Sequence, residues 1–222
     1  TLLRLLKREL SPRGELSGNI TIMGKDRNEL SDRESAEKIG FVMQSPDSQT
    51  VCDKVSAELA FGLESFGVKS GEIQSRVGEM AAFFGIEPLY DRDISTLSGG
   101  QKQLVALCSV MATDPDILLL DEPTAQLDPV AARELLGILD RLNKEMGVTI
   151  IIAEHDPEEL FDSCDKILYL AKGKTEFFGT PALTAKYFVE NALEGFLPET
   201  AKAFTRLCDD LPLNVRQGRA KL

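Results

Sequence analysis

LSGGQ at residues 97–101, ILLLDEP at 117–123 and LD at 127–128 form the stretch that decides the fold of this 222-residue chain. The apolar run that ends in two acids predicts a strand buried on both faces of a parallel sheet. Such a strand delivers its last side chains at the carboxyl end of the sheet, where ligands bind in open α/β folds. Ser98 is a good N-cap, so a helix is expected over 99–113. The stretch therefore predicts an α/β domain with a ligand site at the two acids.

Outside this stretch, strands and helices alternate along the chain. We expect strands at 15–24, 39–43, 116–120, 148–153, 167–170 and 174–178, and further helices at 1–10, 52–66, 72–84, 129–146, 157–163 and 181–194. This alternation predicts a mostly parallel sheet with flanking helices, with the helices between about 52 and 97 as a side lobe. After Pro198 apolar residues become sparse, which predicts a weakly packed C-terminal extension or the start of a linker.

Composition argues against several classes of protein. The formal net charge is -11 and the sequence pI is near 4.7, which disfavours a protein that coats nucleic acid, because neutralising phosphates requires a basic surface. The four cysteines are scattered without a CxxC pair, so we expect neither a zinc site nor a disulfide framework, and a reducing cytosol fits best. We also expect no membrane-spanning segment and no signal peptide.

In this order, the motifs resemble those of the ATP-binding cassette (ABC) ATPases, over about residues 1–190. The resemblance implies a P-loop NTPase-type sheet with a helical signature subdomain, and an ATP hydrolase that uses ATP and Mg²⁺. The implied division is a RecA-like ATPase core at 1–45 and 115–195, a helical subdomain with the signature motif at 46–114, and a C-terminal extension or linker at 196–222.

The resemblance assigns roles to residues at the ends of three predicted strands. Asp121 is implied to hold Mg²⁺ through the water shell of the metal, and Glu122 to act as the general base that polarises the attacking water. Gln44, which follows the strand at 39–43, is implied to approach Mg²⁺ and that water. His155, the only histidine, is implied to contact the γ-phosphate. The alternative is a pair of helix-capping or surface acids, a loop glutamine, and a structural or exposed histidine.

The LSGGQ motif is implied to bind a nucleotide held by a second subunit. Its glycines let the backbone approach a phosphate, and the helix N-terminus presents free N–H groups. The implied nucleotide contacts are Ser98, Gly99, Gly100 and Gln101, with Asp128 lying across the interface between two subunits. Gln126 stands where many family members have Gly or Ser. The implied assembly is a head-to-tail dimer of ATPase domains with two ATPs between them. Alternatively, SGG is an ordinary turn and helix cap.

One expected motif is absent from the sequence. ABC ATPases carry a glycine-rich phosphate loop, G-x-x-G-x-G-K-[ST]-[ST], before the first helix of the core. Thr1 with the helix after it resembles the last residue of that loop and the helix that follows. We therefore expect Thr1 to lie at the α-phosphate and this chain to bind ATP poorly without the loop lysine. An ordinary helical N-terminus is the alternative.

Further likeness points to one branch of the family. IGFVMQSPDSQ at 39–49, ELAFGLE at 58–64 and TAQLDP at 124–129 look like the ATPase subunits of energy-coupling factor (ECF) importers of vitamins and cobalt. This implies a peripheral protein on the cytoplasmic face of the membrane. It would bind a transmembrane component through the groove around 46–66, beside the loop that carries Gln44 (the Q-loop). The apolar residues of that groove are equally explained as core at helical spacing. The tail at 198–222 resembles the region that joins two ABC halves in tandem ECF ATPases.

Two other classes stay open. A soluble ABC ATPase of DNA repair would carry long coiled coils between Gln44 and Leu97, but only 52 residues separate them and they contain no heptads. One that acts on the ribosome would need a basic surface. The second class is a regulatory domain that keeps the fold without hydrolysis. Intact Glu122 and His155 argue against it, whereas the missing phosphate loop favours it for this chain.

Overall fold

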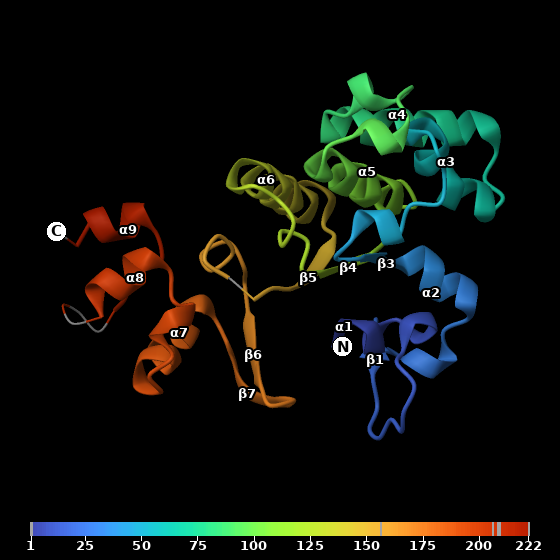
Figure 1. Ribbon diagram of the computed structural model, residues 1–222. Coiled ribbons are helices and arrows are strands. Elements are labelled where there is room, and N and C mark those ends of the chain that lie inside the picture. The colour runs from blue at the N-terminus through green and yellow to red at the C-terminus, as the bar shows by residue number, and fades with distance from the viewer. Residues whose placement is uncertain (1, 156, 206, 208–209, 222) are drawn as a thin grey trace. The chain divides into compact units, whose positions relative to one another are not determined.

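The computed structural model describes residues 2–155, 157–205, 207 and 210–221. Contacts within the chain divide it into two compact units, Thr1–Glu154 and His155–Leu222, and each is described by itself. The predicted α/β fold class is confirmed by a parallel sheet with helices in the first unit (Figure 1). The predicted division into core, helical subdomain and extension stays a prediction.

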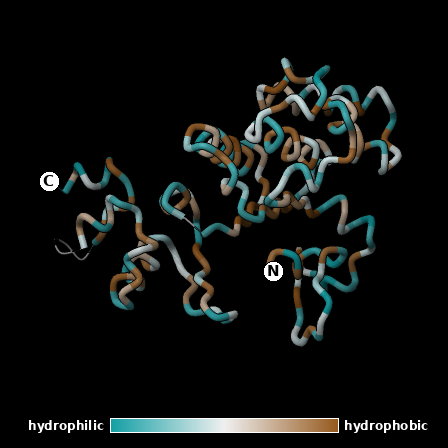
Figure 2. The backbone as a smooth tube through the Cα atoms, in the orientation of Figure 1, coloured by the Kyte–Doolittle hydropathy of each residue, from teal (hydrophilic) through white to brown (hydrophobic). Residues whose placement is uncertain are grey.

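The sheet of the first unit contains β3 (Ile39–Val42), β4 (Ile117–Asp121) and β5 (Thr149–Ala153), in the order β3-β4-β5. Both neighbouring pairs are parallel, with Val42 opposite Leu120 and Asp121 opposite Ala153. The middle strand is apolar along its length in Figure 2, and its leucines at 118–120 are fully buried. Each such side chain stabilises the fold by about 1.5–3 kcal/mol relative to an exposed one. This burial confirms that the apolar run is a central strand.

Helices α3 (Val55–Ser65), α4 (Ser70–Phe84), α5 (Gly99–Met111) and α6 (Pro129–Met146) share one core with the sheet. Their periodic apolar faces supply the buried contacts, and α3 and α4 both contact α5. The buried members include Val55, Leu59, Leu63, Ile73, Val77, Ala81, Leu107, Met111, Leu135, Leu139 and Leu142. Short 3₁₀ turns η3 (Pro46–Ser48), η4 (Glu87–Leu89) and η5 (Ile94–Thr96) connect these elements.

The N-terminal region differs from the predictions. The predicted helix at 1–10 ends earlier, as α1 (Leu2–Leu6) followed by the 3₁₀ turn η1 (Arg8–Leu10). The predicted strand at 15–24 is wrong over most of its length, because only β1 (Thr21–Ile22) pairs, with β2 (Lys25–Asp26). Its first residues are exposed and extended without a partner strand among the described residues, so their side chains bury no face.

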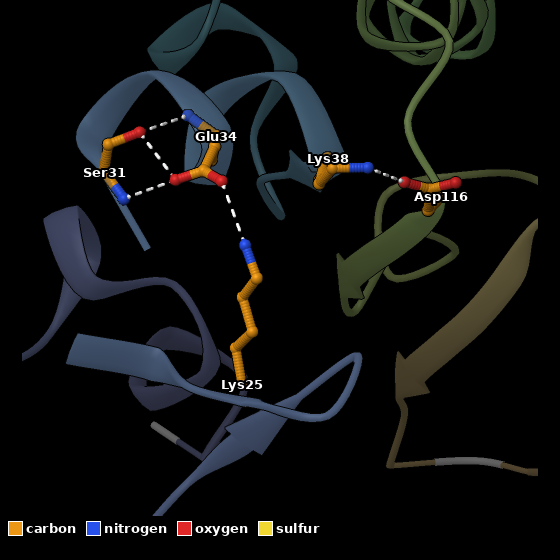
Figure 3. A network of polar contacts seen from close by, with 5 residues as sticks. All are labelled: Lys25, Ser31, Glu34, Lys38 and Asp116. Atoms are coloured by element: carbon orange, nitrogen blue, oxygen red, sulfur yellow. Dashed lines mark hydrogen bonds and ion pairs between the residues drawn. The ribbon is translucent and has the colours of Figure 1, made fainter. Parts of the chain in front are cut away.

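A polar network that was not among the predictions surrounds helix α2 (Asp32–Lys38), which follows the 3₁₀ turn η2 (Arg27–Glu29). Ser31 and Glu34 form a reciprocal capping box at the start of the helix, and Lys25 pairs with Glu34 at 3.3 Å. These contacts lower the pKa of Glu34 to about 2, chiefly through the backbone hydrogen bond from Ser31. At the other end, Lys38 pairs with Asp116 at 2.9 Å, just before β4 (Figure 3).

The second unit is a hairpin with helices. Strands β6 (Ile167–Ala171) and β7 (Lys174–Gly179) are antiparallel, and they are followed by α7 (Pro181–Glu190), η6 (Glu194–Phe196), α8 (Glu199–Phe204) and α9 (Val215–Arg219). The aromatic core of the unit includes Tyr169, Phe177, Tyr187, Phe188 and Phe196, whose rings lie 4.5–6.4 Å apart in tilted, edge-on and stacked pairs.

Two predictions for this unit are corrected. Residues 157–163 form hydrogen-bonded turns rather than a helix, beginning with the Leu160 N–H that donates to the Pro157 carbonyl. The tail is not weakly packed at its start, because Leu197 and Ala201 are buried with Phe161 and Phe188. Sparse apolar residues were misleading there, since several of those present, Ala201, Leu211 and Leu213, pack in or against the aromatic core.

Among the described residues, no helix combines the length and the apolar character that crossing a membrane requires. The described cysteines, Cys52, Cys108 and Cys164, are free thiols. Burial raises the pKa of the Cys108 thiol to about 12, so this side chain behaves as a small apolar core residue.

Candidate functional site

Three parallel strands bring polar residues to one edge of the sheet in the first unit. Asp121 is the last residue of β4, Gln44 follows β3 by two residues, and Glu154 comes directly after β5. Because parallel strands end at the same edge, these side chains gather although they lie far apart in sequence. The sequence placed Gln44, Asp121 and Glu122 at this edge, and the structure brings them there together.

A direct hydrogen bond joins Gln44 to Glu122. The Gln44 Nε2 donates to the Glu122 Oε2 at 2.8 Å, across 78 residues of sequence. The amide thus holds one carboxylate oxygen in a fixed direction. An oriented carboxylate at the end of a buried strand is the geometry that a general base requires.

The backbone of Glu122 has an unusual conformation. Its φ is +49°, in the left-handed region that a residue with a side chain rarely adopts. The Glu122 N–H donates to the Ala153 carbonyl at 2.9 Å, so the pairing of β4 with β5 extends one residue beyond the strand. The left-handed residue then turns the chain sharply away. This conformation sends the Glu122 side chain in a direction that a continuing strand would not give.

Asp121 has a basic neighbour that the sequence analysis missed. The Arg4 Nε on α1 lies 4.0 Å from the Asp121 Oδ2, and the Asp121 side chain keeps 23% of its exposure. This distance is at the limit for an ion pair, and Arg4 is itself half exposed, so the pair contributes little to stability. Asp121 therefore remains accessible to a ligand. The only sequence signal for Arg4 was its place in the first helix.

A second link crosses the same edge. The Thr124 N–H and the Thr124 hydroxyl both donate to the Glu154 Oε1, at 3.1 and 2.7 Å. Neither residue was among the predicted site residues. The position of Glu154 at the end of an apolar strand was the signal that could have indicated it, because side chains at that edge face the ligand site.

The LSGGQ motif forms the N-terminus of α5. Ser98 is the N-cap: its hydroxyl accepts from the Gln101 N–H at 3.3 Å, and its own N–H donates to the Gln101 Oε1 at 3.1 Å. This reciprocal capping box leaves the first N–H groups of the helix directed outward, where they can bind an anion. Ser98 and Gly99 are exposed, which suits a contact with another molecule.

The signature helix lies against the segment that follows Glu122. A Cβ atom added at Gly100 would lie 3.2 Å from the Cβ of Ala131, and one at Gly99 would lie 3.9 Å from the Gln126 carbonyl oxygen. Gly100 is therefore needed for close packing, whereas Gly99 has room. Gln126, the departure from the common family pattern, contributes its backbone to this contact.

Asp128 acts as a helix cap. Its Oδ1 accepts from the N–H groups of Val130 and Ala131, at 2.9 and 3.0 Å, at the start of α6. The side chain is exposed, so the cap keeps it at the surface in one orientation. The predicted role of Asp128 between two subunits stays a prediction.

Two predicted residues lie elsewhere. His155 is exposed and begins the second unit, directly after Glu154 in the chain. Its predicted contact with a γ-phosphate stays a prediction. Thr1, the predicted contact of the α-phosphate, lies outside the described residues.

The donors at the edge of the sheet fit a weakly held Mg²⁺. Among the described residues, no three His, Cys, Asp or Glu side chains converge into a metal site. Mg²⁺ is commonly bound by one or two carboxylates together with waters and substrate phosphates, rather than by a cage of protein ligands. The accessible Asp121 carboxylate and the Gln44 amide oxygen match that requirement.

The fold and the site define an α/β protein whose central strand ends in two acids, and in which the segment after these acids packs against a glycine-rich helix N-terminus. A family model described as ABC transporter matches residues 1–125, which is more than half of the chain. The chain belongs to the ABC transporter family, to its ATP-binding part.

Relatives and solved structures agree with this family. A protein named as an ABC transporter ATP-binding protein of Bacillus thuringiensis is 40% identical over all of this chain, which covers 41% of that protein. One of Streptomyces coelicolor is 43% identical over 76% of this chain and 30% of its own length. The chain thus spans about two fifths or less of these relatives.

Among solved structures, cbiO1 from Clostridium perfringens, described as part of the ABC transporter complex cbiONQ, matches with a TM-score of 0.72 and 32% identity, over 92% of this chain and 76% of that one. The ATP-binding cassette MJ0796, described as a dimer in a post-hydrolysis state bound to ADP and Pi, matches with a TM-score of 0.64 and 28% identity, over 74% of each chain.

Proposed function

We propose that this chain is part of the ATP-hydrolysing subunit of an ABC importer of the ECF type, which takes up vitamins or cobalt and other metals. The observation that carries the proposal is the hydrogen bond from Gln44 to Glu122, one residue after Asp121 at the carboxyl end of the central strand. The likeness to cbiO1, named as part of a transporter complex, supports the importer branch.

In this proposal the site residues divide the chemistry of hydrolysis. Glu122 polarises the attacking water and accepts its proton, and Gln44 orients the Glu122 carboxylate. Asp121 and Gln44 would hold Mg²⁺, which neutralises developing phosphate charge when ATP is bound. His155 contacts the γ-phosphate. Each of these groups acts by position and charge, as phosphoryl transfer demands.

The second half of the site comes from another subunit in this proposal. The N-terminus of α5, with Ser98, Gly99, Gly100 and Gln101, faces the nucleotide of a second ABC ATPase domain, and Asp128 lies between the two. The exposed Ser98 and Gly99 support this arrangement. So does MJ0796, a cassette described as a dimer. Closure and reopening of the dimer would then move membrane partners.

The proposed partner in the membrane is a transmembrane component, reached through the Q-loop groove around 46–66 on the cytoplasmic face. Val51 and Phe61 in this region are exposed apolar residues, which supports contact with another protein. The 52 residues between Gln44 and Leu97 form compact helices rather than a coiled coil, which disfavours the DNA-repair class. The net charge of -11 disfavours nucleic acid as a partner.

The test is Mg²⁺-dependent ATP hydrolysis by the full-length protein and its Glu122→Gln variant. We expect turnover to fall by roughly 10²–10⁴-fold with ATP binding retained, because the amide keeps the shape but cannot accept a proton. Glu134→Gln, an exposed acid on α6, is the matched control and should keep full turnover. Unchanged turnover in Glu122→Gln would remove Glu122 from the role of base.

We further propose that the 222 residues by themselves hydrolyse ATP poorly, because their sequence contains no lysine-bearing phosphate loop. A comparison of this chain with the full-length protein in the same assay tests this. Equal activity in the two would mean that the nucleotide site has been assigned to the wrong residues.

A further inference from the structure

We propose that Glu154 is a positioning residue for ATP hydrolysis. It fixes Thr124, and through Thr124 it holds Glu122 and the turn that packs against the LSGGQ helix, residues 122–127, in place. The proposal rests on the proposed function, since positioning matters only if Glu122 acts as the base. The observation behind it is the pair of hydrogen bonds from Thr124 to one oxygen of Glu154.

The link between Glu154 and Thr124 is strong because it consists of two hydrogen bonds to one carboxylate oxygen. A carboxylate that accepts from both an N–H and an O–H group of one residue makes two charge-assisted hydrogen bonds, which are roughly twice as strong as neutral ones. The hydroxyl distance of 2.7 Å is short and both residues are partly buried, so water competes weakly. The link spans 30 residues of sequence and joins the ends of β4 and β5.

The segment that Thr124 anchors begins at Glu122. The strained Glu122 backbone is held on one side by its N–H bond to the Ala153 carbonyl. On the other side, the Ala125 N–H donates to the Glu122 carbonyl at 3.3 Å, in a turn that includes Thr124. Removing the Glu154 side chain would take away the attachment of Thr124 to the end of β5 and leave the bond from the Glu122 N–H to the Ala153 carbonyl. The left-handed φ of Glu122 would then be free to relax toward an ordinary strand conformation.

The same anchor reaches the signature helix. The Leu127 N–H donates to the Thr124 carbonyl at 3.0 Å, so Thr124 also fixes the position of Leu127. Leu127 and the neighbouring Gln126 backbone lie within 4 Å of the sites where Gly100 and Gly99 would carry side chains. Glu154 is thus connected, through one turn, to both the base and the face offered to a second subunit.

The first arm of the test measures amide hydrogen exchange across residues 122–128 in this chain, in wild type and Glu154→Ala. We expect exchange at these amides to speed up about tenfold when the anchor is removed, which corresponds to about 1.4 kcal/mol of local stability. Glu176→Ala, an exposed acid on β7, is the control and should leave the segment unchanged. Unchanged exchange in Glu154→Ala overturns the proposal, whether or not the protein hydrolyses ATP.

The second arm measures ATP hydrolysis by the full-length protein. Glu154→Ala should lower kcat by roughly ten- to a hundredfold and leave KM for ATP within about twofold, since misplacing a catalytic group costs rate rather than binding. Glu154→Gln keeps an acceptor oxygen and should restore most of the rate. Thr124→Ser, which keeps the hydroxyl, should be near wild type, whereas Thr124→Val should be slow.

The outcomes separate the two proposals. Faster exchange with unchanged kcat, or a loss that appears only in KM, overturns the positioning role while the proposed function stands. No hydrolysis by the wild-type full-length protein overturns the proposed function, and the catalytic role of Glu154 with it. Additive effects of Glu154→Ala and Thr124→Val would also contradict the proposal, because residues that act through one link must couple.

Discussion

The carboxyl end of β4 and the N-terminus of α5 differ in how their polar groups are satisfied. At the end of β4, contacts come from distant parts of the chain: Gln44 reaches Glu122 across 78 residues, and Thr124 reaches Glu154 across 30. At the N-terminus of α5, Ser98 and Gln101 satisfy each other within three residues. The first end is organised by the tertiary fold, whereas the second is organised locally and presents its surface outward.

Under the proposed function, this difference teaches how an active site shared by two subunits is divided. A base must be held in one direction before the reaction, so its neighbours come from several strands. A surface that meets a second subunit only has to keep its backbone exposed and its helix capped, and five consecutive residues suffice for that. Three predictions would break or sharpen the comparison, and a fourth tests a separate capping network in the same unit.

The largest effect is expected at the outward-facing end. Ser98→Arg places a bulky cation where a second subunit should dock, so ATP hydrolysis by the full-length protein should fall at least about 100-fold, since small misplacements already cost that much. Binding of ATP to the separate subunit should persist, which nucleotide titration would measure. Ser98→Ala is the control: it removes the cap, costing about 1 kcal/mol of stability, without the bulk. Normal activity in Ser98→Arg would contradict a head-to-tail dimer.

A smaller effect is expected at the end of β4. Gln44→Ala removes the amide that orients Glu122, so kcat should fall by roughly ten- to a hundredfold, less than for loss of the base itself. Steady-state kinetics of the full-length protein would measure this. Gln74→Ala, at an exposed position on α4, should behave as wild type. If both variants kept the wild-type rate, the hydrogen bond between Gln44 and Glu122 would not contribute to catalysis.

The two signature glycines should differ in their effect on stability. Ala at either position gains helix propensity, but a methyl group at Gly100 meets the Ala131 Cβ at 3.2 Å, whereas at Gly99 it has room. We expect Gly99→Ala to be more stable than Gly100→Ala by about 1 kcal/mol, as measured by urea unfolding of this chain. Equal stabilities would show that α6 shifts to make room for the methyl group at position 100.

The smallest effect concerns the capping network of α2, which lies at neither end of the comparison. The pKa of Glu34 is lowered to about 2 in the fold, against about 4.3 in an unfolded chain. The stability that this carboxylate supplies is therefore complete above about pH 4.3 and is lost as the pH falls toward 2. In Glu34→Gln, Tm should fall less steeply with decreasing pH over that range. Above about pH 6, the dependence of Tm on pH should be nearly the same as in wild type. An unchanged acid slope would mean that the capping box does not hold the charge.

Much of this protein follows from local sequence. The central strand was predicted because an apolar run must be buried on both faces, and the start of α5 because Ser98 is an efficient cap. The placement of Asp121 and Glu122 followed from the rule that ligands bind at the carboxyl ends of parallel strands, whereas the role of Gln44 was implied by the family resemblance. These features depend on neighbours a few residues away or on the strand period, so the amino-acid sequence alone determines them.

The tertiary structure decided what local patterns could not. The residue patterns misled at 15–24, where only Thr21 and Ile22 form a paired strand, and at 157–163, where hydrogen-bonded turns replace the predicted helix although Phe161 is buried. Arg4 beside Asp121 and Glu154 bound to Thr124 are contacts between distant segments, and no spacing rule predicts them. The physical reason is that a hydrogen bond across a sheet edge depends on strand order and register, which the whole core fixes at once.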